Sequence, residues 1–390
     1  MTRKDWLQTI FYTLLSVVLF GATFGAGYYF RGTQYRTLSD RYPLLAEVQA
    51  ILDDRYLGET LDDTALNRAL VRGLLEAYED PYTFYVEPVQ AQLNSDNLAG
   101  VYGGIGSYLS RNAAGDLVLD PFPNSPAEQA GILTDDVLLE VDDTPITPEL
   151  SIDDIVSIVR GPVGTVVTLL IRTGDDAPRE VEVTRAQIDL PSVDWRLLEQ
   201  DPTIGYIRLT RFSDRSAEEI TTAIQDLRDD GATRLVLDLR NNGGGLLDSA
   251  VEVADVFLGA GVVMYEEILG QPEKTFRAEN GEIGEDLPLV VLVNGNSASA
   301  SEILAGALQD RDRAPLIGQT TFGKGSVQLI FPLSDGGSLH VTNARWFTPN
   351  RTNLSAGGLT PDIMIEFDAD AHGQGFDPEL TRAIEVLNEQ

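Results

Sequence analysis

The first hydrophobic feature of the chain is an uncharged stretch at residues 6–30, which follows Asp5 and ends before Arg31. About 20 apolar residues are enough for a helix to cross a bilayer, so this stretch is long enough to span one. A cleaved signal peptide is the alternative, but its apolar core usually has only about 7–15 residues. We therefore expect residues 1–36 to form an uncleaved membrane anchor with one helix.

The periodicity of the next segment predicts helices in residues 37–97. Aliphatic residues recur every three or four positions in residues 44–52 and again in residues 66–75, which is the period of a helix with one apolar face. The helical pattern continues to about Tyr85. We interpret this region as a small unit of helices that pack on one another.

Short runs of aliphatic and β-branched residues, such as residues 166–171, replace the helical period in residues 98–186. Such runs are typical of strands. Two short helices are expected between them. One follows Ser125-Pro126, a serine suited to capping and a proline suited to a first turn, and the other covers residues 152–159. Strands with two helices in about 90 residues make a complete small α+β domain.

From residue 204 onward, strand-like apolar runs alternate with loops and helical segments. Residues 234–239 form one such run and precede a loop of asparagine and glycine at residues 241–245. Residues 287–293 form another and precede a loop that leads into a helix starting at Ala300. This order predicts a layered α/β core in which the loops gather at strand ends, where sites form.

The composition narrows the chemistry available to such a site. The 390 residues include 28 Lys and Arg against 61 Asp and Glu, a formal net charge of −33, and so acidic a protein would repel a nucleic-acid backbone. The absence of cysteine excludes disulfides, a thiolate nucleophile and cysteine-ligated metals. The only histidines are His340 and His372. Catalytic proton transfer is therefore expected to use Lys, Asp, Glu or Tyr.

A serine and Lys324 are the candidate nucleophile and base. Three serines, Ser297, Ser299 and Ser301, lie where an apolar run meets a helix, and a helix N-terminus presents N–H groups that stabilise a developing oxyanion. The alternative is that Ser299 only caps the helix, because Ser299 and Glu302 have the spacing of a capping box. A lysine acts as a base at neutral pH only if its surroundings lower its pKa. Lys324 stands between two glycines in an apolar and threonine-rich context.

Part of the strand-rich region resembles a PDZ domain. The segments that carry the resemblance are residues 124–132, residues 135–138 and the run Tyr102-Gly103-Gly104-Ile105-Gly106. A glycine-rich run can offer backbone N–H groups to a carboxylate beside a strand edge that accepts a peptide, or it can be a simple hairpin turn. Together with the other segments, it predicts that residues 102–106 bind the C-terminus of a peptide.

Three runs in the last third of the chain carry a family resemblance: Ser-Ala-Ser-Ala-Ser-Glu at residues 297–302, Ala-Gly-Ala-Leu-Gln-Asp at 305–310 and Thr-Phe-Gly-Lys-Gly-Ser-Val-Gln at 321–328. Together they resemble the carboxyl-terminal processing peptidases, the tail-specific serine proteases of peptidase family S41 that contain a PDZ domain. The resemblance implies that Ser299 is the nucleophile, that Lys324 is the base and that Gln328 orients the lysine ammonium. If Lys324 and Gln328 lie on one strand, their i and i+4 spacing puts them on the same face.

The same resemblance assigns further residues. It places the oxyanion hole at the backbone N–H groups of Ala300 and of Gly244 or Gly245, in a loop that has Gly243 where the family commonly has proline. It also marks Arg160 as a regulatory candidate, in a segment similar to the part of the PDZ domain that contacts the protease core.

The resemblance implies the fold as well. We expect an α/β (α+β) multidomain protein whose core is layered and resembles the enoyl-CoA hydratase fold, with a PDZ domain inserted. The expected parts are the anchor at residues 1–36, a helical region at 37–97, the PDZ domain at 98–186, the protease core at 187–367 and an acidic C-terminal extension with a terminal helix at 368–390.

The implied activity is that of a serine endopeptidase without a metal or an organic cofactor. It would cleave partly unfolded or extracytoplasmic proteins after its PDZ domain captures their apolar C-terminal tails, and its body would be tethered to a membrane outside the cytoplasm. A catalytically silent PDZ scaffold and an acyl-CoA enzyme are the alternatives. The combination of Ser299, Lys324 and Gln328 argues against the scaffold. The sequence leaves open the natural substrate, the oligomeric state and any activating adaptor.

The C-terminal extension contains one further candidate. Asp368, Asp370, His372 and Glu379 nearly match the ligand positions of a calcium loop. However, His372 replaces an oxygen ligand, and the preceding segment has the pattern of a strand where an entering helix is required. Calcium binding and a plain acidic turn both stay open, and we favour the turn.

Overall fold

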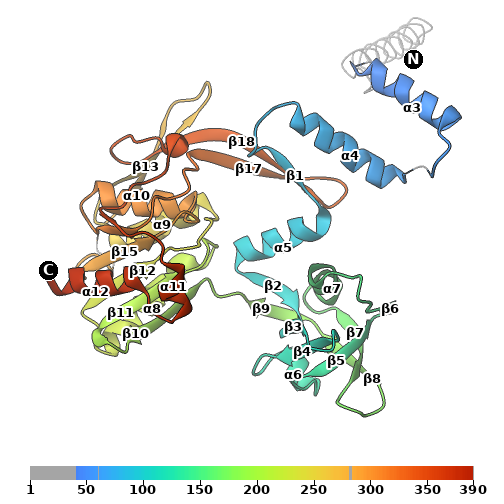
Figure 1. Cartoon of the computed structure of the whole chain (residues 1–390), viewed down its shortest axis with the longest axis horizontal. Coiled ribbons are helices and arrows are strands. Elements are labelled where there is room, and N and C mark those ends of the chain that lie inside the picture. The colour runs from blue at the N-terminus through green and yellow to red at the C-terminus, as the bar shows by residue number, and fades with distance from the viewer. Residues whose placement is uncertain (1–40, 60, 281–282, 390) are drawn as a thin grey trace, which may run out of the picture. The chain divides into compact units, whose positions relative to one another are not determined.

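The computed structural model describes residues 41–59, 61–280 and 283–389 (Figure 1). The expected anchor at residues 1–36 lies outside these ranges. Within them, no helix combines the length and the apolar character that crossing a membrane requires. The chain divides into two compact units, one up to Leu70 and one from Val71, and each is described by itself.

The first unit contains helix α3 (Pro43–Arg55) and the start of helix α4 (Asp63–Glu76). Both helices form where the periodicity predicts them, but neither contains a buried residue. Leu44 is 69% exposed and Ile51 is 54% exposed. The expectation that these helices pack on one another is therefore wrong for the described residues, since their apolar faces stay open.

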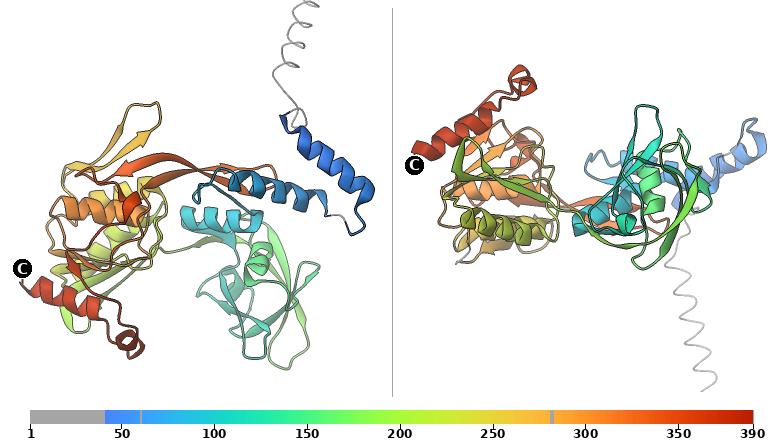
Figure 2. Two further views of the ribbon diagram at one scale, coloured as in Figure 1. Left: turned by 45° about the horizontal axis from the view of Figure 1, so that its top comes forward. Right: turned by 90° about the horizontal axis from the view of Figure 1, so that it is seen from below.

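The centre of the second unit is a six-stranded sheet covered by helices on both faces (Figures 1 and 2). Its strands are, in spatial order, β10 (Val193–Leu198), β11 (Asp201–Leu209), β12 (Arg234–Asp238), β15 (Leu289–Val293), β16 (Leu316–Gly318) and β19 (Ile363–Met364). From β11 onward all neighbours are parallel, whereas β10 and β11 are antiparallel. This layering is the predicted α/β core.

The alternation of side chains along the strands builds two hydrophobic cores. Leu235 and Leu237 of β12 join the core on one face of the sheet, and Val236 joins the core on the other face. The first face is covered by α8 (Ser216–Asp229), α9 (Leu247–Phe257) and α10 (Ala300–Asp310), and the second by α12 (Pro378–Glu389). All residues of β15 are buried. Burial on both faces explains its unbroken apolar sequence.

A second sheet carries the segment that follows Lys324. Its strands are β1 (Phe84–Val86), β18 (Ser338–Phe347), β13 (Gly261–Ile268) and β14 (Lys274–Ala278), and β17 (Ser326–Pro332) also pairs with β18. Strand β1 corrects the expectation of helix up to Tyr85, because Tyr85 pairs with Leu339 of β18. Pairing with a distant strand decides the conformation here, which local periodicity does not encode.

The strand-rich region has a hydrophobic core of its own. Its sheet has the order β3 (Ser107–Arg111), β4 (Leu117–Pro121), β5 (Asp136–Val141), β7 (Val166–Arg172) and β8 (Arg179–Thr184), with β6 (Thr144–Pro145) paired to β5. The two expected helices form as α6 (Pro126–Gln129) and α7 (Ile152–Val159). Strand β3 lies at an edge of this sheet. The ribbon β2 (Val101–Gly104) and β9 (Ala186–Asp189) connects the region to the rest of the chain, and α5 (Pro88–Ala99) precedes it.

The C-terminal extension forms helices α11 (Ala369–Gly373) and α12. The carboxylate of Asp368 accepts hydrogen bonds from the backbone N–H groups of Asp370 and Ala371 and so caps α11. The segment is thus a short helix, and it does not adopt the loop that oxygen ligands at alternate positions would need to surround calcium.

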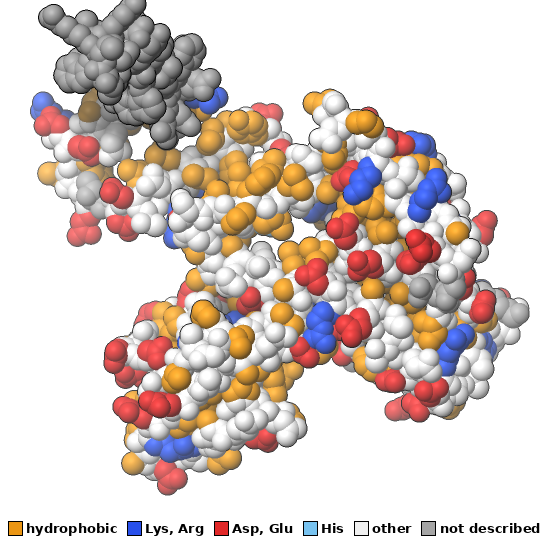
Figure 3. Space-filling view, turned by 180° about the vertical axis from the view of Figure 1, so that it is seen from behind, with side chains coloured by type: hydrophobic (Ala, Val, Ile, Leu, Met, Phe, Trp, Pro, Cys, Tyr) orange, Lys and Arg blue, Asp and Glu red, His pale blue; other side chains and the backbone are white. Residues whose placement is uncertain are grey.

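The surface reflects the composition. Acidic side chains are spread over the face shown in Figure 3, in keeping with the net charge of −33. A field of this sign disfavours association with polyanions.

Candidate active site

Ser299 is held in an unusual backbone conformation at the N-terminus of α10. Its φ of 56° and ψ of −114° are rarely adopted by residues other than glycine. Such strain persists only where the surroundings enforce it, and it gathers at functional sites. The backbone N–H of Ser299 donates to Glu302 Oε2 at 2.9 Å, which is one half of the predicted capping box.

The carboxylate of Glu302 does more than cap the helix. Glu302 is fully buried, and besides the Ser299 N–H it accepts hydrogen bonds from Thr321 Oγ1 at 2.5 Å, from the Gly323 N–H at 2.7 Å and from the Lys324 N–H at 2.9 Å. One side chain thereby ties the backbone of Ser299 to the backbone of Lys324. The sequence analysis treated Glu302 only as a capping residue and missed this link.

The Lys324 side chain is partly buried, and its ammonium has defined neighbours. Nζ donates a hydrogen bond to Gln328 Oε1 and lies 5.4 Å from the centroid of the Tyr82 ring. The amide of Gln328 donates in turn to the carbonyl oxygen of Tyr82. Burial lowers the pKa of Lys324, and the negative charge of Glu302 opposes that change. Because the pKa of Lys324 is lowered overall, a larger fraction of this side chain is neutral at a given pH than for a lysine in water.

The expected strand geometry of this pair needs a correction. Lys324 precedes β17, which begins at Ser326, and the pairing of β17 with β18 shifts register between Val327 and Gln328. The two residues therefore do not lie on one regular strand. Their side chains come together because Lys324 lies in the turn before β17 and because the pairing of β17 is irregular next to Gln328.

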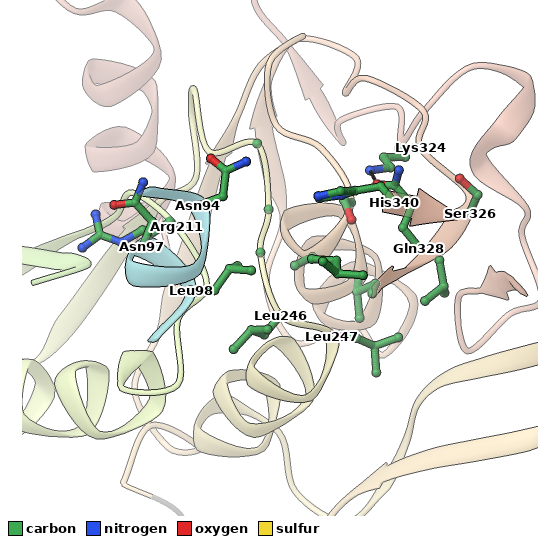
Figure 4. Close-up of a pocket in the computed structure, with 18 of the residues that line it drawn as sticks. Asn94, Asn97, Leu98, Arg211, Leu246, Leu247, Lys324, Ser326, Gln328 and His340 are labelled. Atoms are coloured by element: carbon green, nitrogen blue, oxygen red, sulfur yellow. Dashed lines mark hydrogen bonds between the residues drawn. The ribbon is translucent and has the colours of Figure 1, made fainter. Parts of the chain in front are cut away.

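Ser299, Lys324 and Gln328 line one cavity of about 460 Å³ (Figure 4). Ser299 and Lys324 both line this cavity. Among the described residues no hydrogen bond joins their two side chains, because the Lys324 ammonium donates to Gln328. Apolar residues cover another part of the wall, among them Leu246, Leu247 and Ile330, while α5 contributes Asn94, Asn97 and Leu98. The cavity can thus hold an apolar side chain beside the serine.

His340 also lines this cavity, although the sequence analysis gave histidine almost no part. Its ring stacks on Phe84 with the centroids 4.7 Å apart. Burial lowers the pKa of His340, and the positive charge of Lys324 lowers it further. The ring is therefore neutral at pH 7, since its ordinary pKa of about 6.5 is already below that pH.

The loop after β12 is built around Asn242, a fully buried side chain. Its Oδ1 accepts from the Gly244 N–H at 2.9 Å, and its Nδ2 donates to the Leu209 carbonyl at 2.8 Å. Its backbone carbonyl accepts from Ser301 Oγ at 2.8 Å. Asn242 therefore connects the glycine loop to the helix that begins beside Ser299, another link that the sequence analysis missed.

Gly244 lies against the candidate nucleophile. Its φ is 103°, and a Cβ built on it would come within 2.8 Å of the Ala298 carbonyl oxygen and 2.9 Å of Ser299 Cβ. The N–H of Gly244 is already used by Asn242, whereas the N–H groups of Gly245 and Ala300 make no hydrogen bond with the described residues. Both are free to bind an oxyanion.

The direction of the Gly245 N–H follows from its neighbours. The Gly244 carbonyl accepts from the Phe212 N–H at 3.0 Å. In a trans peptide the N–H points opposite to the carbonyl, so the Gly245 N–H points away from Phe212. The sequence alone did not indicate which of the two glycines, Gly244 or Gly245, has a free N–H group.

The expected peptide-binding residues are spread over two elements. Tyr102, Gly103 and Gly104 belong to β2, while Ile105 is buried in the core of the strand-rich region and Gly106 has a φ of 72° before β3. The Gly103 carbonyl accepts from the Gly161 N–H at 3.0 Å. The glycine-rich segment leads directly into β3. Because β3 is an edge strand of its sheet, an additional strand can pair with it.

Arg160 connects this region to α5. Its guanidinium lies 3.8 Å from the centroid of the Tyr102 ring, and its Nη1 is 2.7 Å from Asp96 Oδ2. The two charged side chains are only 18% and 13% exposed. Because α5 also carries Asn97 and Leu98 into the cavity of Ser299, Arg160 is linked to the cavity through one helix.

Comparison with known proteins agrees with this architecture. Residues 203–365 match peptidase family S41, and residues 117–173 match a PDZ domain. The chain is 37% identical over 325 residues to a carboxy-terminal-processing protease of Bartonella bacilliformis, covering 82% of this chain and 74% of that protein. It is 36% identical over 321 residues to the carboxyl-terminal-processing protease of a Synechocystis species, covering 81% and 75%. A solved photosystem II D1 C-terminal processing protease is similar with a TM-score of 0.47 and 30% identity, covering 81% of this chain and 86% of that one.

Proposed function

The chain belongs to the carboxyl-terminal processing serine proteases of peptidase family S41, and on this premise we propose that Ser299 and Lys324 form its catalytic dyad. The observation that carries the proposal is that the base candidate has a pKa lowered by burial and lines the same cavity as the strained serine. Lysine becomes an effective general base under these conditions. A PDZ domain, matched at residues 117–173, accompanies the protease.

Neutral Lys324 takes the proton of the Ser299 hydroxyl as Oγ attacks the scissile carbonyl carbon. The N–H groups of Ala300 and Gly245 bind the oxyanion of the tetrahedral intermediate, and the Lys324 ammonium then protonates the leaving amine. Water hydrolyses the resulting acyl-enzyme, with Lys324 again as the base. Gln328 holds Nζ between turnovers, and proton transfer requires Nζ to leave Gln328 and reach Ser299 across the cavity that both residues line.

The PDZ domain selects the substrate by its C-terminus. An extended apolar tail adds to the open edge of β3, and its terminal carboxylate is bound near residues 102–106. Arg160 then senses the bound tail through Tyr102 and passes the change to α5. The chain is held at a membrane by residues 1–36 with its body outside the cytoplasm, and its core has the layering of the enoyl-CoA hydratase fold.

The test uses the full chain with an unfolded polypeptide that ends in apolar residues, and mass spectrometry identifies the products. The wild type should cut, while the Ser299→Ala and Lys324→Ala chains should bind the tail without cutting. Amidation of the substrate's C-terminus should slow cleavage if the tail is captured by its carboxylate. Normal turnover by Lys324→Ala would refute the dyad, and binding without any cleavage by the wild type would favour the silent scaffold.

A further inference from the structure

A second cluster of charged groups lies outside the catalytic cavity. It is formed by residues at the end of β12 and by residues of α11, of α12 and of the segment between these two helices. Arg240 donates two hydrogen bonds to Asp377, at 2.9 and 2.8 Å, and also pairs with Asp238. His372 of α11 and Glu379 of α12 complete the cluster. These residues line a cavity of about 240 Å³ that shares no lining residue with the cavity of Ser299.

The orientation of His372 presents a lone pair to this cluster. Its Nδ1 lies 2.9 Å from the carbonyl oxygen of Asp368, which can only accept, so Nδ1 carries the hydrogen. In the neutral ring the other nitrogen, Nε2, is then an acceptor. It lies 3.3 Å from Glu379 Oε2 and 4.0 Å from Asp377 Oδ1. Three electron-rich atoms thus face one another beside the Arg240 guanidinium, which donates hydrogen bonds to Asp377 but not to Glu379.

Glu379 supplies an independent observation. The residue is only 2% exposed, and its Oε2 has no hydrogen-bond partner among the described residues. Arg240 Nη1 is 3.6 Å away, which is too long for a hydrogen bond. A buried carboxylate oxygen without a donor is costly. Three carboxyl groups, those of Asp238, Asp377 and Glu379, lie around the single guanidinium of Arg240.

We propose that His372 Nε2, Asp377 and Glu379 bind a divalent transition-metal ion of the Zn²⁺ type. Their ligand atoms lie within 4.8 Å of one another, and the adjoining cavity has room for water ligands. One imidazole nitrogen with two carboxylates suits zinc better than calcium, which takes six to eight oxygens. A histidine ligand usually donates its other N–H to a carbonyl or carboxylate, as His372 does to Asp368.

This site replaces the calcium loop considered from the sequence. Asp368 is used as a helix cap, and Asp370 is exposed, so neither carboxylate faces the cluster. The metal would join α11 to α12 next to Arg240, the residue before the glycine loop of the active site. Its role is to hold the C-terminal extension on the core, since the residues that surround it do not reach the cavity of Ser299.

The test treats the full chain with a chelator, removes the chelator, and titrates ZnCl₂ while heat of binding and thermal unfolding are recorded. We expect one equivalent of Zn²⁺ to bind and to raise the melting temperature, and Ca²⁺ at the same concentration to do neither. His372→Ala and Glu379→Gln should each weaken binding by at least the roughly 10–100-fold that loss of an outer-shell partner costs. Asp370→Asn, which removes a neighbouring exposed carboxylate, should bind as the wild type does.

Four outcomes would overturn the site: no saturable zinc binding, zinc binding retained by His372→Ala and Glu379→Gln, Ca²⁺ binding as tight as that of Zn²⁺, or a loss of zinc affinity in Asp370→Asn. If Glu379→Gln fails to fold, His372→Ala decides, because that ring is 28% exposed and its loss leaves no buried cavity. Zinc bound only at surface acids would reveal itself as a loss of affinity in Asp370→Asn.

Discussion

Glu302→Gln is the substitution that tests most directly how this active site is assembled. Oε1 of Glu302 accepts two hydrogen bonds, from Thr321 and Gly323, and Oε2 accepts two more, from Ser299 and Lys324. Glutamine has nearly the same shape, but its NH2 group can only donate. If that group replaces Oε2, the hydrogen bonds from the Ser299 and Lys324 N–H groups are lost; if it replaces Oε1, the bond from the Gly323 N–H is lost, while the Thr321 hydroxyl can turn and accept from it.

The size of the effect follows from these contacts. Hydrogen bonds to a charged group contribute about 1.5–3 kcal/mol each, so the loss of one or two should lower the free energy of unfolding by about 1.5–6 kcal/mol. If half of this loss affects the relative placement of Ser299 and Lys324, kcat should fall by roughly 3- to 100-fold. The backbone of Ser299, which has a strained φ, is directly involved because its N–H bonds to this carboxylate.

The pH dependence provides a second and independent readout. The negative charge of Glu302 raises the pKa of Lys324, while burial lowers it more strongly. Removing that charge lowers the pKa of Lys324 further. In the proposed dyad the neutral lysine is the active form, so the acidic limb of the rate profile should move to lower pH in Glu302→Gln, although kcat falls.

The assay measures cleavage of an internally quenched peptide with an apolar C-terminus from pH 5 to pH 10, together with thermal unfolding. Glu218→Gln serves as the control, since it removes an exposed glutamate of α8. Unchanged kcat and unchanged melting temperature in Glu302→Gln would refute the assembly role. An acidic limb that moves to higher pH would refute the electrostatic part of the argument.

Three further outcomes are expected. For the wild type, kcat/KM should rise with pH through the lowered pKa of Lys324 and reach half its maximum below pH 10.5, and a midpoint at or above that value would exclude a desolvated base. Gly244→Ala should remain folded but lose roughly 100-fold in kcat, measured in single turnovers, because its methyl group would collide with Ser299 and displace the oxyanion loop. Arg160→Ala and Asp96→Ala should each slow cleavage of tail-bearing substrates by a few fold. The double variant should be no slower than either single variant, since the two side chains form one ion pair. Additive losses would show that they act separately.

Local features of this protein could be predicted from its sequence. The unbroken apolar run of β15 and the helix that follows it placed Ser299 at a strand-to-helix junction, because burial on both faces and a helical period both leave a mark on neighbouring residues. The resemblance to the S41 proteases named the residues that now line one cavity. Their catalytic roles stay predictions until the variants are measured.

Local sequence patterns were not sufficient where contacts with residues far along the chain determine the structure. The segment around Tyr85 has helical spacing but pairs with β18 as a strand. Helix α3 has an amphipathic spacing and no buried residue. At residues 368–379, where the sequence nearly matches a calcium loop and we favoured a plain turn, the chain forms a short capped helix, and Asp377 bonds to Arg240.

The tertiary structure alone shows how the site is held together. A capping-box spacing is visible in the sequence, but it cannot reveal that the same Glu302 carboxylate also holds Lys324, more than twenty positions away. Nor can it show that Asn242 occupies the N–H of Gly244 and leaves that of Gly245 free. The periodicity of a chain records which face of each element is buried. It does not record against what that face is buried, because the partner is chosen by the packing of the whole fold.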